Sequence, residues 1–345
     1  MTVRIGIIGV GGRSVREMHD LVQIPEAEIV GLCDIDEPRC TAAVDTINGS
    51  LPEGANPIQP ELFSDHRAML DAVELDAVYI SLPTFAHGQI DHDVIAAGKA
   101  VLIEKPIALE LSVAKEIAAH IAEKGIVNSV GYQMRYAPSV GQTRALLEGV
   151  TIGMVIAVRW GQLPGTPWWR VQEQSGGMLI EQHTHGIDLV RYFVGEPDTF
   201  YAAGDTVLLT DVPNLNIFDV NAVTVRFKNR AVGMIGNSPA AHAGTPPNIT
   251  NVVHILAKDL TVTAGFDSTT VWRTGQEPET IASDQDSNLL LNQAFVNAVA
   301  NNTQDGILSP YSDSLRSFAF TYAAQKSAEL RREVRLTDDL EVVAQ

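Results

Sequence analysis

Two hydrophobic spacings alternate along the first third of the chain. Val3–Ile8 is a short β-branched run typical of a buried strand, whereas 15–24 has the three-to-four-residue spacing of an amphipathic helix. Strands alternating with helices are typical of a doubly wound parallel sheet that binds its ligand at the carboxyl ends of the strands. We therefore predict an α/β Rossmann domain over residues 1–128. Its further strands are predicted at 27–34, 75–83, 100–106 and 126–135, and its further helices at 87–99 and 112–125.

The pattern of the later chain changes to a period of two. In 221–229, Val223, Val225 and Phe227 alternate with polar residues, which predicts strands with one buried face. We expect an α+β domain over 129–345 with a large, mostly antiparallel, open-faced sheet that serves substrate binding and oligomerisation. An open sheet face is normally covered, so we predict a homodimer or homotetramer through it. Further strands are predicted at 154–162, 231–239, 251–265 and 269–275, and 237–248 is read as a loop without chemistry.

Charge and cysteine content narrow the classes of partner. Lys and Arg number 24 against 42 Asp and Glu, a formal net charge of −18, which disfavours nucleic acid and anionic membranes as partners. The chain has no long uncharged apolar run, so we expect no membrane span. With only Cys33 and Cys40, neither a disulfide framework nor a Cys-rich zinc site is expected. We expect a reduced, cytoplasmic protein.

The turn after the first strand has the spacing of a dinucleotide-binding loop. Gly9, Gly11 and Ser14 form G-x-G-x-x-S, in which the glycines allow a tight turn and a close approach to a pyrophosphate. Asp34 ends the second strand about twenty residues later, where an acid accepts hydrogen bonds from the adenosine ribose. Its charge also repels a 2′-phosphate, so the sequence favours NAD over NADP.

A titratable cluster, "EQHTHGID", lies in a segment that we interpret as one helix, 178–194. On such a helix Glu181, His185, Asp188 and Tyr192 form one stripe. His183 points elsewhere, along a core-facing row with Ile187, Val190 and Val194. The two histidines then have no common direction, and we expect no metal site. An imidazole that titrates near neutrality instead suits removal of a hydroxyl proton.

Adjacent aromatic residues precede this segment. Trp168 and Trp169 lie in a predicted Pro/Gly-rich loop and are costly to expose. They either stack on a sugar or anchor a contact between subunits, and the sequence leaves both open. Arg135, near the domain junction, is a further candidate for substrate binding.

Taken in order, these landmarks resemble those of the Gfo/Idh/MocA oxidoreductase family. The similarity runs from residue 3 to about residue 200 through the glycine loop, Pro83-x-x-x-His87, "AAGKAVLIEKP", "VGYQMRYAP" and "GGMLIEQHTHGIDLVRYFVGEP". The resemblance implies a dehydrogenase or reductase that uses NAD, or less readily NADP, on a CH–OH group of a sugar, polyol or related compound. The sequence departs from the family's common pattern at Glu181, where Asp is usual, and at His183, where Gly is usual.

The resemblance also implies roles for individual residues. It makes Lys105, His185 and Glu181 catalytic, with His185 as the general base, Lys105 on the reacting oxygen and Glu181 in support, and it implies a cis Lys105–Pro106 bond. Substrate contacts are expected from Lys105, Arg135, Trp168, Trp169, Glu181 and His185. Cofactor contacts are expected from Gly9, Gly11, Gly12, Arg13, Ser14, Asp34, Ser81, Pro83, His87, Glu104 and Lys105.

Two other functions remain open from the sequence. One is a glycoside hydrolase that retains its NAD and acts through transient oxidation. The other is a sensor that binds the dinucleotide without chemistry, although such a module needs neither Lys105 nor His185.

Overall fold

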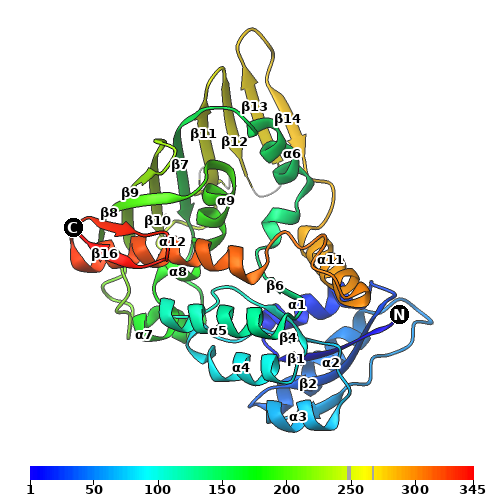
Figure 1. The fold of residues 1–345 in the computed structure, drawn as a ribbon. Helices are drawn as coiled ribbons and strands as arrows, with labels where there is room; N and C mark the ends of the chain where they lie inside the picture. The colour runs from blue at the N-terminus through cyan, green and yellow to red at the C-terminus, as the bar shows by residue number, and fades with distance from the viewer. Residues whose placement is uncertain (247–249, 266–267) are drawn as a thin grey trace. The chain divides into compact units, whose positions relative to one another are not determined.

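The chain divides into two compact units in a computed structural model that describes residues 1–246, 250–265 and 268–345 (Figure 1). The first unit comprises 1–108, 112–133 and 287–312, and the second comprises 109–111, 134–286 and 313–345. The first unit thus includes residues 287–312, whereas the sequence-based prediction assigns all residues after 128 to one domain. Two residues of the loop expected at 237–248 lie outside the described residues.

The first unit is built on a six-stranded parallel sheet of order β3-β2-β1-β4-β5-β6, which confirms the doubly wound α/β prediction. Its central strands consist of buried apolar residues because helices cover both faces (Figure 1). The strands are β1 (Val3–Ile8), β2 (Ala27–Cys33), β3 (Glu61–Phe63), β4 (Ala77–Ile80), β5 (Ala100–Ile103) and β6 (Asn128–Val130). The helices are α1 (Gly12–Leu21), α2 (Glu37–Ser50), α3 (His66–Ala72), η1 (Thr84–Ala86), α4 (Gln89–Ala96), α5 (Leu111–Lys124) and α11 (Ser287–Asn301).

Only residues 128–130 of the strand predicted at 126–135 form a strand, which is β6. β6 ends at Val130, and 133–136 form the short helix η2 (Gln133–Tyr136). Tyr136, two residues before Pro138, closes η2 just ahead of α6 (Pro138–Leu147), a helix that starts at a proline as many helices do.

The second unit contains a ten-stranded sheet of order β14-β13-β12-β11-β7-β10-β9-β8-β15-β16. Its pairs are antiparallel except for β10 with β7, so the expected mostly antiparallel sheet is confirmed. Its strands are β7 (Ile152–Trp160), β8 (Pro197–Asp205), β9 (Val220–Phe227), β10 (Val232–Ser238), β11 (Asn251–Ala257), β12 (Leu260–Ala264), β13 (Ser268–Arg273), β14 (Glu279–Ala282), β15 (Val334–Leu336) and β16 (Val342–Ala344). The remaining helices are η3 (Pro167–Arg170), α7 (Gln172–Ser175), α8 (Met178–Glu181), α9 (Thr184–Val194) and α12 (Tyr311–Leu330).

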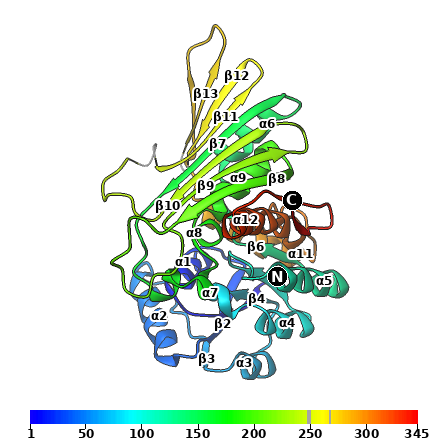
Figure 2. The ribbon, with the colours of Figure 1, turned by 90° about the vertical axis from the view of Figure 1, so that its left-hand side faces the viewer.

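Helices cover one face of this large sheet. Figure 2 shows α6, α9 and α12 against that face, and Phe320 of α12 packs edge-on against Phe200 and Phe227 of the sheet. The alternation predicted for β9 is observed, since Val223, Val225 and Phe227 are all buried. The opposite face carries exposed apolar side chains.

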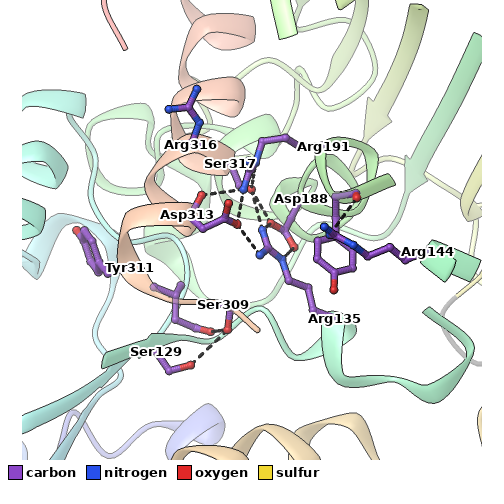
Figure 3. Close-up of polar contacts among 12 residues, drawn as sticks. Ser129, Arg135, Arg144, Asp188, Arg191, Ser309, Tyr311, Asp313, Arg316 and Ser317 are labelled. Carbon is purple, nitrogen blue, oxygen red and sulfur yellow. Dashed lines mark hydrogen bonds and ion pairs between the residues drawn. The ribbon is translucent and has the colours of Figure 1, made fainter. Parts of the chain in front are cut away.

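A buried network of charged groups joins α9 to α12 and η2 (Figure 3). Both Asp188 oxygens accept hydrogen bonds from the Arg135 guanidinium, at 2.8 and 2.5 Å, and neither side chain is exposed to solvent. Asp313 of α12 pairs with Arg135 at 2.5 Å and also with Arg191 of α9. Burial would raise the pKa of the Asp313 carboxyl, but the two guanidinium groups hold it below its usual value.

Candidate active site

The glycine loop after β1 is shaped by a close approach to the next strand end. Gly9 has φ +84°, and a Cβ there would lie 2.3 Å from the Ser81 carbonyl oxygen, so only glycine fits. The Ser14 hydroxyl donates back to the Gly9 carbonyl, and the Ser81 amide donates to the Ile8 carbonyl at 2.9 Å. The predicted residues Gly9, Ser14 and Ser81 are therefore brought together.

Open space lies over the start of α1. A Cβ on Gly11 or Gly12 would meet no atom within 4 Å, and Gly11 caps the helix without any side-chain hydrogen bond. An anionic group can therefore approach the first backbone amides of α1 closely. This arrangement suits the diphosphate of a dinucleotide.

Asp34 lies at the carboxyl end of β2, as predicted. Its carboxylate accepts hydrogen bonds from the Val10 amide at 2.8 Å and from the Asp36 amide at 2.9 Å, which ties it to the glycine loop. Its neighbour Ile35 is 96% exposed. An apolar side chain held in water beside a nucleotide loop offers a surface for an adenine ring. Ile35 is not among the predicted site residues, although its place directly after the strand-end acid is a signal in the sequence.

Glu104 and Lys105 follow β5, and the Lys105–Pro106 bond is cis, as expected. Glu104 is buried; it accepts a hydrogen bond from Arg13 Nε at 2.8 Å and one from the Lys105 amide at 3.2 Å. A Cβ on Gly131 would lie 2.4 Å from Glu104 Oε1, so that glycine makes room for the carboxylate. Lys105 itself is half-buried.

Arg13 serves a buried acidic cluster. Besides Glu104 it pairs with Glu17 at 2.5 Å and donates to Asn288 of α11 at 2.7 Å. Asn292 of α11 donates to both Glu17 and Asp20. Burial raises the pKa of the Glu17 carboxyl to about 7 in spite of the Arg13 charge. Three of the Arg13 side-chain nitrogens are thus engaged inside the first unit.

Pro83 and His87, which follow β4, differ in their surroundings. Pro83 precedes η1 on the backbone, whereas the His87 ring has no exposed surface and its Nδ1 lies 3.1 Å from an Asp91 oxygen. The Gly88 amide also donates to Asp91, at 2.7 Å. The His87 ring therefore lies in the interior of the first unit.

The segment predicted as one helix over 178–194 is two helices in the second unit, which corrects that prediction. α8 ends at Glu181 and α9 begins at Thr184, and the amides of Gln182 and His183 both bond to the Met178 carbonyl. Glu181 is buried at the end of α8, and His185 is half-buried in the first turn of α9. The expected stripe is broken, because Asp188 turns inward to Arg135.

His183 is a neutral interior group. Its side chain is buried, and burial together with the Arg159 charge lowers the pKa of the imidazole to about 3. A Cβ on Gly186 would lie 2.6 Å from this ring, so Gly186 accommodates it. As predicted, the row that continues through Ile187, Val190 and Val194 is buried. A histidine that stays uncharged at any ordinary pH is unsuited to carry the proton.

The remaining candidates for substrate binding differ in exposure. Trp168 and Trp169 form part of η3 rather than a loop; both are half-buried, with ring centroids 5.5 Å apart. Arg135 is enclosed with Asp188 and Asp313, so its guanidinium supports the fold. Across the described ranges, no group of three or more His, Cys, Asp or Glu side chains is placed to hold a metal ion. Likewise, none of the described helices is long and apolar enough to cross a bilayer.

Comparison with known proteins matches both units. Residues 3–132 match the model of the GFO_IDH_MocA oxidoreductase family with its NAD-binding Rossmann fold, and 141–256 match the GFO/IDH/MocA C-terminal domain. The chain is 28% identical to the uncharacterised oxidoreductase YrbE of Bacillus subtilis over 69% of this chain and 68% of that one. It is 23% identical to myo-inositol 2-dehydrogenase of Thermotoga maritima over 97% and 99%. A solved levoglucosan dehydrogenase in complex with NADH superposes with a TM-score of 0.85 at 18% identity, covering 98% of this chain and all of that one.

The raised pKa of Glu17 predicts a pH-dependent stability. The folded protein keeps this proton up to about pH 7, whereas the unfolded chain releases it near 4.5, so the contribution is complete below pH 4.5 and is lost as pH rises through about 7. Urea unfolding at pH 5 and pH 8 should show a fall in the free energy of unfolding that Glu17→Gln reduces. The exposed Glu26→Gln is the control and should follow the wild type; an equal fall in Glu17→Gln would contradict the assignment.

Proposed function

Because the chain belongs to the Gfo/Idh/MocA oxidoreductase family, we propose that it oxidises a secondary alcohol of a sugar, polyol or related carbohydrate with NAD. The family assignment makes it an NAD(P)-dependent oxidoreductase of CH–OH groups. The observation that carries the finer proposal is the break between α8 and α9. It sets a buried carboxylate, Glu181, and a half-buried imidazole, His185, on either side of one turn, while burial keeps His183 neutral.

Oxidation of an alcohol requires removal of a hydride and of a proton. NAD, when bound, accepts the hydride from carbon. We assign the hydroxyl proton to His185, because its imidazole is only half-buried and imidazole is the usual general base of proteins. The Lys105 ammonium hydrogen-bonds the same oxygen and stabilises its developing negative charge. Glu181 orients the imidazole.

The fit of a dinucleotide rests on the first unit. Gly11 and Gly12 leave the amides of α1 uncovered for a diphosphate, and Ile35 offers an apolar surface for adenine. Asp34 and Asp36 put negative charge beside the ribose position, and Arg39 is held by Asp36 at 3.0 Å. This charge balance supports NAD over NADP, since a 2′-phosphate would meet carboxylates.

We predict that Lys105→Ala and His185→Ala each lower turnover by about 10² to 10⁴, the usual contribution of a general acid or base. Both variants should bind NAD as the wild type does, because neither side chain forms the glycine loop. Turnover is followed by NADH absorbance over a panel of sugars and polyols, and NAD binding by calorimetry. The exposed Lys124→Ala serves as a control. Wild-type turnover in either variant would show that its assigned role is wrong.

Asp34 gives a separate prediction about the choice of cofactor. Asp34→Asn keeps an acceptor for the Val10 amide but removes the charge, so the ratio of kcat/KM for NADP to that for NAD should rise about tenfold or more. The exposed Asp45→Asn on α2 should leave that ratio unchanged. A wild type that already prefers NADP would refute the selection of NAD by Asp34.

We further propose that the uncovered face of the large sheet forms a homo-oligomer interface. Two neighbouring rows of that face carry exposed apolar side chains on β8, β10, β11 and β13, each separated from the next by one strand: Tyr201, Val232, Met234, Leu256 and Trp272. Threonines such as Thr224 and Thr261 lie between them and Arg226 lies opposite Val232, so the patch is broad and carries little charge. A surface of this kind is unusual on a monomer.

This interface predicts a mass in solution above that of one chain, which is 37.2 kDa. A charge at the centre of the patch, Met234→Glu, should yield the single-chain mass in light scattering at micromolar concentration, because it buries an unpaired carboxylate. Leu330→Glu places the same charge on an exposed apolar residue at the end of α12 and should not change the mass. A wild type with the mass of one chain would exclude the interface.

A further inference from the structure

A row of polar side chains crosses one end of the helix-covered face of the large sheet. Arg159 of β7 lies opposite Asn251 of β11 and Asn237 of β10, and Asn237 lies opposite Asn221 of β9. We call these four residues the polar row. The next row on the same face is buried and apolar, namely Ala157, Ile235, Val223 and Val253. The sheet thus changes abruptly from a packed core to hydrogen-bonding groups.

The Arg159 guanidinium is held in place by neutral groups. Its Nη1 donates to Asn251 Oδ1 at 2.5 Å and its Nη2 to Gln182 Oε1 at 3.0 Å. A Cβ on Gly161 would lie 3.2 Å from Nη1, so the glycine leaves room for the group. Arg159 is half-buried, and these two bonds use two of the five guanidinium N–H donors.

The charge of Arg159 lacks the neutralisation that other arginines of this unit receive. Arg135 and Arg191 each pair with two carboxylates, whereas Arg159 makes no ion pair with any residue that the structure describes. Burial lowers the pKa of the guanidinium, and the Glu181 charge acts in the opposite direction. A fixed, partly desolvated cation with neutral partners is a typical site for an anion.

The polar row lies beside the proposed proton-transfer residues. Gln182, which holds Arg159, directly follows Glu181, and α8 packs against β10. Further hydrogen-bonding capacity is unused here: Asn237 Oδ1 and both polar side-chain atoms of Asn221 are buried without a partner among the described residues. Buried polar atoms of this kind are uncommon and suit a hydroxylated ligand or its waters.

We propose that Arg159 binds a carboxylate of the substrate, so that the alcohol oxidised is carried by a polyhydroxy acid, such as a sugar acid, rather than by a neutral sugar. The inference rests on the proposed function, since it names the substrate class of that same site. The carboxylate accepts hydrogen bonds from guanidinium N–H groups that Asn251 and Gln182 do not engage. These two partners keep the guanidinium fixed. The reaction at the alcohol carbon is unchanged.

The test compares acids with their neutral counterparts. Initial rates with NAD are measured for D-galacturonate against D-galactose and for D-gluconate against D-sorbitol. The wild type should favour an acid over its counterpart by about tenfold or more in kcat/KM. Arg159→Gln should lower kcat/KM for the acid about tenfold to hundredfold, mainly through KM, and change the neutral compound by no more than about twofold. Arg159→Lys should retain part of the preference, because it keeps the charge and loses the fork geometry.

Arg144→Gln is the matched control. Arg144 is exposed on α6 and stacks over the Tyr192 ring at 3.9 Å, so its loss removes a surface guanidinium from the same unit without touching the polar row. It should leave both rates unchanged. A wild type that favours the neutral compounds overturns the proposal. So does an equal loss for acid and neutral compound in Arg159→Gln, which would mean that Arg159 only positions α8.

A binding measurement distinguishes failure of the proposed function from failure of the carboxylate subsite. If no acid or neutral compound is oxidised, calorimetric binding of D-galacturonate and D-gluconate to the NAD-saturated protein decides the subsite. Binding that is at least tenfold tighter in the wild type than in Arg159→Gln supports it. Equal binding, or none, overturns it.

Discussion

The placement of α9 depends on one buried ion pair, between Arg135 and Asp188. The carboxylate meets the guanidinium through two hydrogen bonds, and a second carboxylate, Asp313 of α12, closes the group from the other side (Figure 3). Buried charges are costly to desolvate, so such a pair contributes less to stability than to specificity. Its hydrogen bonds are satisfied in one arrangement of the helices only. His185 lies on the same helix three residues before Asp188. The position of the imidazole therefore follows from where Arg135 holds the helix.

An arginine–carboxylate contact also holds a segment of the first unit, beside Lys105. Glu104 is held by Arg13 and enclosed by Gly131, and the next residue in the chain is Lys105. Arg13 itself stands two residues after Gly11, so one guanidinium links the start of α1 to the strand end that carries the lysine. In each unit, then, the residue given a chemical role lies close in sequence to a carboxylate that an arginine holds: Lys105 follows Glu104, and His185 precedes Asp188 by three residues. Holding these carboxylates limits the backbone positions that the lysine and the histidine can adopt.

The sequence predicts well whatever depends on near neighbours. The strand–helix rhythm, the glycine turn against Ser81 and the alternation in β9 come from short-range spacing, and the structure contains them. The ion pairs of Arg135 could not be predicted, because its partners lie far away in sequence, at Asp188 and Asp313. The break at Gln182 and His183 was missed because helical periodicity carries no sign of a single displaced turn. The return of 287–312 to the first unit depends on contacts of Asn288 and Asn292 with α1, which no local pattern reveals.

The net charge of −18 bears on the kind of ligand that such a site selects. At a distance, an acidic chain repels an anion, but salt screens that repulsion beyond about 10 Å at ordinary ionic strength. Within that range the nearest groups decide, and for the polar row these are a guanidinium and three amides. A carboxylate of the substrate is therefore favoured where it reaches Arg159 closely. A general excess of acid thus adds to the selectivity of a cation that has neutral partners, because the remaining acidic surface disfavours an anion.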